Sequence, residues 1–171
     1  ILRDEVRMFR AAGADGVVIG CLNADGGLDL PAMEQLMDAA DGLPVTLHRA
    51  FDLCADPMKA LAQAKTLGVS TILTGCKGSA REGIALLNTL HEQAGDIEIL
   101  AGAGLNAEVI RMLLHETSLT SFHMSGKAVL ESQMRYRNPD VFMGLPGISE
   151  YEIWQTDSAL VRAARDVLDL A

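Results

Sequence analysis

The segment His48-Arg49-Ala50-Phe51-Asp52 holds the densest group of side chains that could do chemistry. An imidazole changes its charge near neutral pH, so His48 beside the guanidinium of Arg49 could bind an anion or transfer a proton. In an alternative interpretation the three groups form an internal network, in which Asp52 pairs with Arg49 or caps a turn. The residue types therefore predict a ligand contact at His48, Arg49 and Asp52 and leave the purely structural role open.

Two loops rich in small residues come later in the chain. Gly102 and Gly104 precede Asn106, which is a residue type that begins helices, and Ser125-Gly126 precedes a lysine. Glycines let main-chain N–H groups approach an anion, and a helix N-terminus adds a favourable field. The two loops therefore predict a phosphate or carboxylate site at Gly102, Gly104, Ser125 and Gly126. In the alternative, the glycines only allow tight turns.

Strand periodicity gives a direction to two histidines. In 45–50, the apolar residues alternate with Thr46 and His48, and in 121–125 they alternate with Ser121, His123 and Ser125. Side chains two positions apart lie on the same face of a strand. We therefore expect His48 and His123 on one face, with His123 as a further ligand contact.

The three cysteines, Cys21, Cys54 and Cys76, fall at or just after strand ends. Thiolates suit Cu(I), so each is a candidate metal ligand. Their spacing matches no metal-binding motif, and cysteine is also an ordinary small core residue. An odd number of cysteines with no CxxC pair argues against a disulfide framework and fits reduced thiols in the cytoplasm.

These residues must be positioned by a repeating pattern of strand, loop and helix. Short β-rich runs recur about every 25 residues, and each is followed by a helix with a 3.6-residue apolar period. Alternating strands and helices predict an α/β protein with a parallel sheet. The predicted strands are 16–20, 44–51, 71–75, 97–101 and 120–125.

Helix boundaries are also readable. Asp56 and Pro57 begin one helix that ends near Gly68, and Asn106 caps another. Residues 131–156 contain prolines and glycines and predict a long loop after the last strand, and 158–170 predicts a final helix. The segment Met134-Arg135-Tyr136-Arg137-Asn138 in this loop could close over an anionic ligand or fix the loop to the rest of the fold.

Five parallel strands could form an open doubly wound sheet or part of a closed barrel. The near-constant unit length, the short strands and the polar residues after each strand favour a (β/α)8 TIM barrel, which carries its site on these loops. The sequence 1–171 would then be a single domain, the C-terminal portion of such a barrel with about five βα units. The expectation is that three βα units are missing ahead of Ile1.

Composition excludes several classes of partner. The 171 residues carry a net charge of −9, which disfavours nucleic acid and anionic lipid surfaces. No apolar run is long enough to cross a membrane, and no segment has the pattern of a signal peptide. We therefore expect a soluble protein without nucleic acid or membrane partners, whose partners are a small anion or metal ion and, in one alternative, a second copy in a homodimer.

Several segments together resemble the CutC family of copper homeostasis proteins. They are 18–33 (VIGCLNADGGLDLPAM), 45–57 (VTLHRAFDLCADP), 72–80 (ILTGCKGSA), 99–104 (ILAGAG), 123–128 (HMSGKA) and 134–138 (MRYRN). The resemblance implies a cytoplasmic (β/α)8 barrel with a role in copper homeostasis or copper binding, and a chain that starts after the family's third strand. It also implies that Cys54 matches a cysteine of similar proteins, whereas Cys21 and Cys76 are local variation.

Three hypotheses follow. The first is a copper-handling protein with Cu(I) as its ligand. The second is a barrel enzyme or sensor for a small anionic, phosphorylated metabolite, which the two small-residue loops favour. The third is a non-catalytic scaffold that dimerises through its helices. No reaction follows from the fold, because barrels host many chemistries.

Overall fold

A computed structural model describes residues 1–76, 78–145 and 147–170. Lys77 and Pro146, which fall in the segments 72–80 and 131–156 discussed above, lie outside the described residues. The helices are α1 (Leu2–Ala11), α2 (Leu30–Ala40), the 3₁₀ helix η1 (Arg49–Leu53), α3 (Pro57–Leu67), α4 (Ile84–Ala94), α5 (Ala107–Glu116) and α6 (Ser158–Asp169). The strands are β1 (Val17–Ile19), β2 (Val45–Leu47), β3 (Thr71–Thr74), β4 (Glu98–Ala101), β5 (Ser121–Phe122), β6 (Lys127–Glu131) and β7 (Glu152–Thr156).

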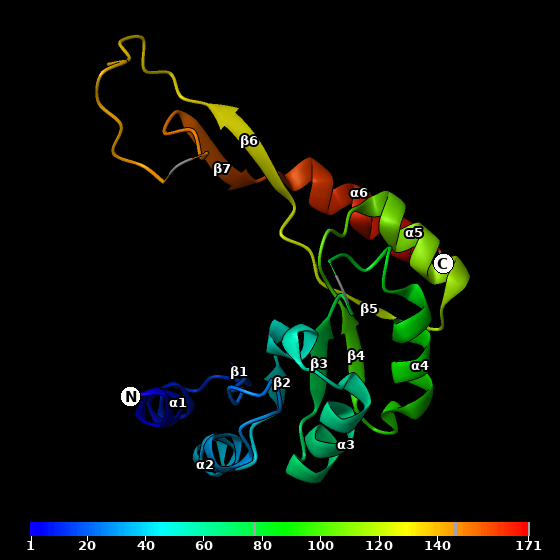
Figure 1. The fold of residues 1–171 in the computed structure, drawn as a ribbon. Coiled ribbons are helices and arrows are strands. Elements are labelled where there is room, and N and C mark those ends of the chain that lie inside the picture. Colours follow the sequence, from blue (N-terminus) through cyan, green and yellow to red (C-terminus); the bar gives the residue numbers. More distant parts are fainter. Residues whose placement is uncertain (77, 146, 171) are drawn as a thin grey trace.

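The first five strands form one parallel sheet in the order β1-β2-β3-β4-β5. Figure 1 shows the sheet curving, with the helices α1 to α5 following its outer side. The α/β class and the parallel sheet are therefore confirmed. Among the described residues the sheet remains open, because β1 and β5 each pair with a single neighbour.

The core lies between the sheet and the helices. Leu47, Ile72 and Ile99 are paired across β2, β3 and β4, and each is at most 1% exposed. Burial of such aliphatic side chains is the main source of stability in this kind of layer. The opposite face of the sheet is more open, since Val18 on β1 is 62% exposed.

The helix ends follow the sequence signals. The side chain of Asp56 accepts hydrogen bonds from the main-chain N–H groups of Met58 and Lys59, at 3.0 and 2.9 Å. Gly68 ends the same helix in the left-handed conformation, with φ of 78°. Asn106 caps α5 by accepting from the N–H of Val109 at 2.9 Å. These caps confirm the helix boundaries that the sequence predicts.

The predicted strand 44–51 divides into two elements. The strand β2 ends at Leu47, and η1 begins at Arg49. The reason is local, because the Nδ1 atom of His48 accepts a hydrogen bond from the N–H of Ala50 at 3.1 Å and caps the 3₁₀ helix. A side chain that satisfies its own neighbouring main chain competes with the strand ladder.

The predicted long loop 131–156 is shorter than expected. Its two ends belong to an antiparallel hairpin, in which β6 pairs with β7 from Lys127 opposite Thr156 to Glu131 opposite Glu152. The hairpin projects away from the parallel sheet, and α6 follows it and packs beside α5 (Figure 1). In the described part of the chain, no helix is long and apolar enough to span a bilayer.

Candidate functional site

The carboxylate of Asp52 lies between the ends of β2 and β3. It accepts hydrogen bonds from the Thr74 hydroxyl and from the N–H groups of Gly75 and Cys76, at 3.2 and 3.1 Å for the two N–H groups. Its side chain is 5% exposed. Because Asp52 is buried and its oxygens are already hydrogen-bonded, it suits a positioning role better than direct contact with a ligand.

The guanidinium of Arg49 is held by this buried carboxylate. Arg49 Nε lies 2.6 Å from Asp52 Oδ2, while the arginine side chain is 47% exposed. A guanidinium fixed at one nitrogen keeps further N–H donors for a planar oxyanion. The predicted pairing of Arg49 with Asp52 is thus present, and it leaves the arginine accessible to a ligand.

The imidazole of His48 packs against the main chain at the end of β1. A Cβ atom added to Gly20 would lie 2.6 Å from His48 Cε1 and 2.7 Å from Nδ1. Since Nδ1 accepts from Ala50, the ring proton belongs on Nε2. Gly20 is therefore a site residue that the sequence reasoning missed. Its position at the end of the predicted strand 16–20 was the feature that could have identified it.

The strand register continues past β2 and β5. The N–H of His48 donates to Ile19 at 3.0 Å, and the N–H of His123 donates to Ala101 at 2.8 Å. Strand pairing from β2 through β3 and β4 to β5 puts Thr46 and Ser121 on the same face of the sheet. His48 and His123 each lie two positions further along, so they are on that face as well. A Cβ on Gly102 would lie 3.9 Å from His123 Cδ2, so this glycine adjoins the second histidine.

The two small-residue loops meet at a cavity of about 560 Å³. The start of α5 supplies Gly104 to Glu108, the loop after β5 supplies Met124 to Lys127, and α6 supplies Leu160 and Ala163. Three predicted ligand-binding residues, Gly104, Ser125 and Gly126, therefore share one cavity. Among the described residues, its lining does not include His48, Arg49, Asp52, Gly102 or His123.

Charged side chains around this cavity are partly engaged elsewhere. Glu108 lies 2.5 Å from Arg81, so its negative charge is offset by that ion pair. The ammonium of Lys127 lies 3.9 Å from the centre of the Trp154 ring, which is a cation–π contact at the edge of the cavity. The first turn of α5 adds the positive end of a helix dipole.

Two residues other than glycine adopt the left-handed conformation beside these strand ends. Cys76 has φ of 62° after β3, and Ala103 has φ of 68° after β4. Such backbone strain persists only where the surroundings impose it, and it gathers at functional sites. The sequence does not reveal either position, because neither residue type favours a positive φ.

The three cysteines lie near two carboxylates. Burial, and then the charge of Asp29, raises the pKa of Cys21, whereas burial and then Asp52 raise the pKa of Cys54. Burial raises the pKa of Cys76 to about 11. Within the described ranges there is no group of three or more His, Cys, Asp or Glu side chains placed to hold a metal ion.

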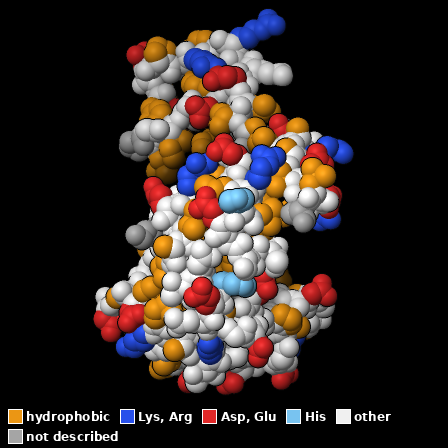
Figure 2. Space-filling model, turned by 90° about the vertical axis from the view of Figure 1, so that its right-hand side faces the viewer, with side chains coloured by type: hydrophobic (Ala, Val, Ile, Leu, Met, Phe, Trp, Pro, Cys, Tyr) orange, Lys and Arg blue, Asp and Glu red, His pale blue; other side chains and the backbone are white. Residues whose placement is uncertain are grey.

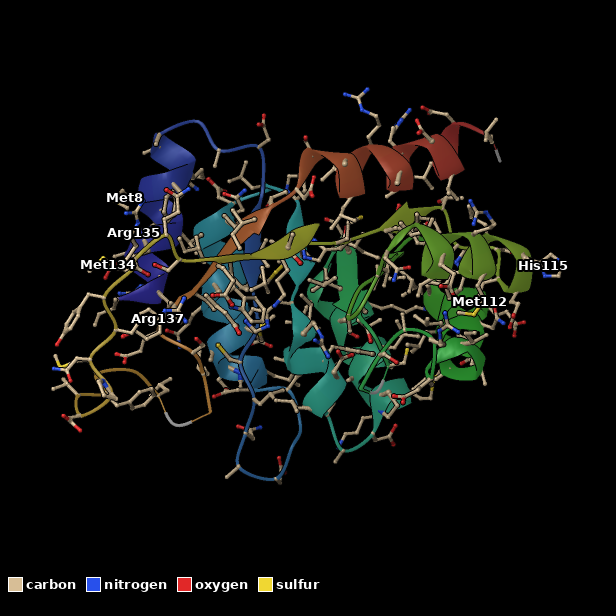
Figure 3. The ribbon with its side chains drawn as sticks, turned by 90° about the horizontal axis from the view of Figure 1, so that it is seen from above. Met8, Met112, His115, Met134, Arg135 and Arg137 are labelled. Carbon is tan, nitrogen blue, oxygen red and sulfur yellow. The ribbon has the colours of Figure 1, made fainter. Side chains whose placement is uncertain are left out.

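The segment 134–138 lies on the hairpin loop. Arg137 Nη2 lies 3.0 Å from Glu131 Oε2, and its guanidinium stacks 4.3 Å from the centre of the Tyr151 ring. Figure 3 shows Met134, Arg135 and Arg137 on the opposite side of the molecule from Met112 and His115 on α5. These contacts hold Arg137 to its own hairpin, so both predicted roles of the segment, closing over an anionic ligand and fixing the loop to the rest of the fold, stay predictions.

Comparisons with known proteins identify relatives over most of the chain. The CutC family model matches residues 1–128. A CutC family protein of Bacteroides thetaiotaomicron is 49% identical over 86% of this chain and 61% of its own length. The human copper homeostasis protein cutC homolog is 40% identical over 95% of this chain and 60% of its own.

A solved structure agrees with these relatives. The crystal structure of a CutC protein from Streptococcus agalactiae matches with a TM-score of 0.66 and 32% identity, over 71% of this chain and 60% of that one. The chain spans about 60% of the length of the curated relatives named above. On the extent of these matches, the chain belongs to the CutC family.

Proposed function

We propose that this CutC-family protein binds a small anionic metabolite, carrying a phosphate or carboxylate group, in the cavity between α5, α6 and the loop after β5. The observation that carries the proposal is that this single cavity is lined by both the 104–107 turn and residues 125–127. Two donor-rich loops at neighbouring strand ends are a common way for α/β proteins to hold phosphate.

The chemistry of the lining suits an anion. The Asn106 side chain accepts a hydrogen bond from the N–H of Val109. The N–H groups that precede it in the first turn of α5 stay available for a ligand. Ser125 adds a hydroxyl donor, and Lys127 adds positive charge at the edge. The carboxylate of Glu108 is the opposing charge, and its ion pair with Arg81 reduces its repulsion of an anion.

His48, Arg49 and His123 lie outside the lining of this cavity and are proposed as contacts for the part of a metabolite that extends from it along the same edge of the sheet, with Gly102 allowing close approach. Parallel strands bring their carboxyl ends to one edge, so groups after β2 and β5 can serve one ligand. In this proposal Asp52 acts through Arg49, because their 2.6 Å ion pair fixes the direction of the guanidinium.

Isothermal titration with inorganic phosphate tests the cavity. We expect a dissociation constant on the order of 1 mM for the free ion, because a whole metabolite would add further contacts. Ala163→Leu places a larger side chain in the lining and should weaken binding about tenfold. Ala159→Leu, on the same helix but outside the lining, is the matched control.

Two outcomes would contradict the cavity proposal. One is an absence of phosphate binding, which would favour the alternative of a non-catalytic scaffold. The other is equal affinity in the Ala163→Leu and Ala159→Leu variants, which would move the binding site away from this cavity.

The open sheet is proposed to be an arc of a (β/α)8 barrel that works in the cytoplasm. In support, five parallel strands follow one another in chain order, the helices cover one side, and the chain matches about 60% of its relatives' length. Five of eight units is about the same fraction. The cytoplasmic location rests on the family resemblance and on the three free cysteines.

Cu(I) binding by Cys54 and Cys76 is a second candidate. It is favoured by the copper homeostasis name of the human relative and by one feature of the chain, that Asp52 accepts the N–H of Cys76 at 3.1 Å and belongs to η1, which Cys54 ends. Cu(I) prefers thiolate ligands, and binding must displace the thiol protons.

An anaerobic Cu(I) titration tests the second candidate. The Cys54→Ser/Cys76→Ser double variant should lose the tight binding that the unmodified chain shows, whereas Cys21→Ser should keep it. Unmodified protein that binds Cu(I) no more tightly than a cysteine-free variant would remove copper from consideration.

A further inference from the structure

The β6–β7 hairpin carries apolar side chains on both faces. Val129 and Trp154 face each other on one side, at 49% and 53% exposure, and Leu130 and Ile153 on the other, at 44% and 51%. Figure 2 shows hydrophobic side chains gathered on the part of the molecule that projects above the helical body. A two-stranded ribbon is marginally stable alone, and an apolar surface of this kind marks an interaction site.

The hydrogen-bond ladder determines which main-chain groups of β6 are unused by β7. Hydrogen bonds from Ser132 to Tyr151, at 2.6 Å, and from Asp157 to Gly126, at 2.8 Å, lie at the two ends of the hairpin. Bonded and non-bonded pairs alternate along an antiparallel ladder. With the register of this hairpin, the residues whose N–H and C=O groups point away from β7 are Lys127, Val129 and Glu131.

We propose that this outer edge of β6 pairs antiparallel with the same edge of a second copy of the chain, around a two-fold axis at Val129. Placing the sequence Lys-Ala-Val-Leu-Glu against itself in this way sets Lys127 opposite the partner's Glu131, and Glu131 opposite the partner's Lys127. The same three residues whose main-chain groups are free on this edge form the bonded pairs of the new ladder. The positions of the free main-chain groups and the pairing of opposite charges therefore favour the same register, the one centred on Val129.

The resulting four-stranded sheet adds positive charge to a row of two like charges. Glu131 and Glu152 lie directly opposite each other, which is unfavourable for like charges, and within the chain Arg137 offsets part of this repulsion through its ion pair with Glu131. In the dimer the partner's Lys127 joins this row beside Glu131. The next row becomes a continuous apolar strip, because Val129 meets the partner's Val129 between the two Trp154 rings.

The outer edge of β7 fits a second copy less well. Self-pairing about Trp154 would set Glu152 opposite the partner's Thr156, which provides no opposite charge. Pairing of opposite charges with a second copy is thus possible on the β6 edge and not on the β7 edge. The closed two-fold arrangement also covers an edge that could otherwise pair with other strands.

Sedimentation velocity of the chain over a range of concentrations tests this dimer. We expect a reversible dimer of the 18.2 kDa chain. Val129→Pro removes an N–H from the outer edge without removing a β6–β7 hydrogen bond, and should raise the dimer dissociation constant about tenfold or more. Glu152→Pro makes the equivalent change on the outer edge of β7; since it also removes the carboxylate opposite Glu131, it should change the dimer dissociation constant far less than Val129→Pro does.

Charge exchange gives a second, independent test that does not introduce proline. Lys127→Glu and Glu131→Lys should each weaken self-association, because each places like charges opposite each other twice. Mixed in equal amounts in phosphate-free buffer, the two variants should form a heterodimer with both pairs restored. The fluorescence of Trp154, the single tryptophan, verifies that the hairpin stays folded in every variant.

A chain that remains monomeric at high concentration would overturn the proposal. So would a dimer that responds to Glu152→Pro and not to Val129→Pro, or a mixture of charge variants that associates no better than either variant alone.

Discussion

At the scale of single residues, the carboxylate of Asp52 shows what the sequence could and could not settle. The spacing in HRAFD predicted either a ligand contact or an ion pair with Arg49, and the structure contains the ion pair. What the sequence could not show is that Asp52 also accepts N–H groups from Gly75 and Cys76, more than 20 positions away. Contacts at that separation depend on how the strands are arranged.

Replacing Asp52 with Asn should lower the free energy of unfolding by about 2 kcal/mol, because a buried charged acceptor is lost. The loss is measured by urea denaturation. Asp25→Asn is the matched control, since Asp25 is an exposed carboxylate that accepts one N–H, from Gly27 at 2.9 Å, and its loss should have little effect. Equal destabilisation by the two changes would show that the Asp52 network is unimportant.

The buried thiol of Cys76 predicts a pH effect. Its pKa is raised from an ordinary value of 9.0 to about 11, so the unfolded chain loses this proton first as the pH rises. The contribution of the protonated thiol is therefore complete below about pH 9 and is lost as the pH rises toward 11. Denaturation curves for the unmodified chain should show a steeper decline over this window than those for Cys76→Ala, and parallel curves would contradict the buried thiol.

At the scale of elements, local signals located the strands and helices well. Period-two alternation and capping residues found all five strands of the parallel sheet and the boundaries of α3 and α5. The hairpin was missed because β6 and β7 are exposed on both faces, so that no clear apolar alternation marks them. The prolines and glycines between them were read as a continuous loop.

Gly20 should not tolerate a side chain, because a Cβ atom at this position would overlap the His48 ring. Gly20→Ala should cost about 1–3 kcal/mol of stability through displacement of that ring. In the His48→Ala background the same change should cost much less, and this double-mutant cycle measures the coupling. Additive effects would place the ring and the glycine out of contact.

At the scale of the whole molecule, the curvature of the sheet and its open edges follow from register and packing. The sequence could predict a parallel sheet, since strands and helices alternate, but whether the sheet closes depends on what pairs with the outer edges of β1 and β5. These strands lie at opposite edges, and the inner face beside β1 is exposed at Val18. The cavity between α5, α6 and the loop after β5 also required α6, which sequence reasoning had not connected with the site.

Hydrogen exchange should reflect these open edges. The amides of β3, which has a neighbour on each side, should exchange more slowly than those of β1 by about tenfold or more. Peptide-level exchange followed by mass spectrometry measures the difference. Equal protection of β1 and β3 would indicate that β1 is paired on both sides in solution.

The most direct test of the anion site is a crystal structure of the chain soaked with tungstate, an anomalously scattering phosphate analogue. The account predicts an anomalous peak within hydrogen-bond distance of the main-chain N–H groups at the start of α5 and of Ser125. Well-ordered tungstate elsewhere, with none in this cavity, would contradict it.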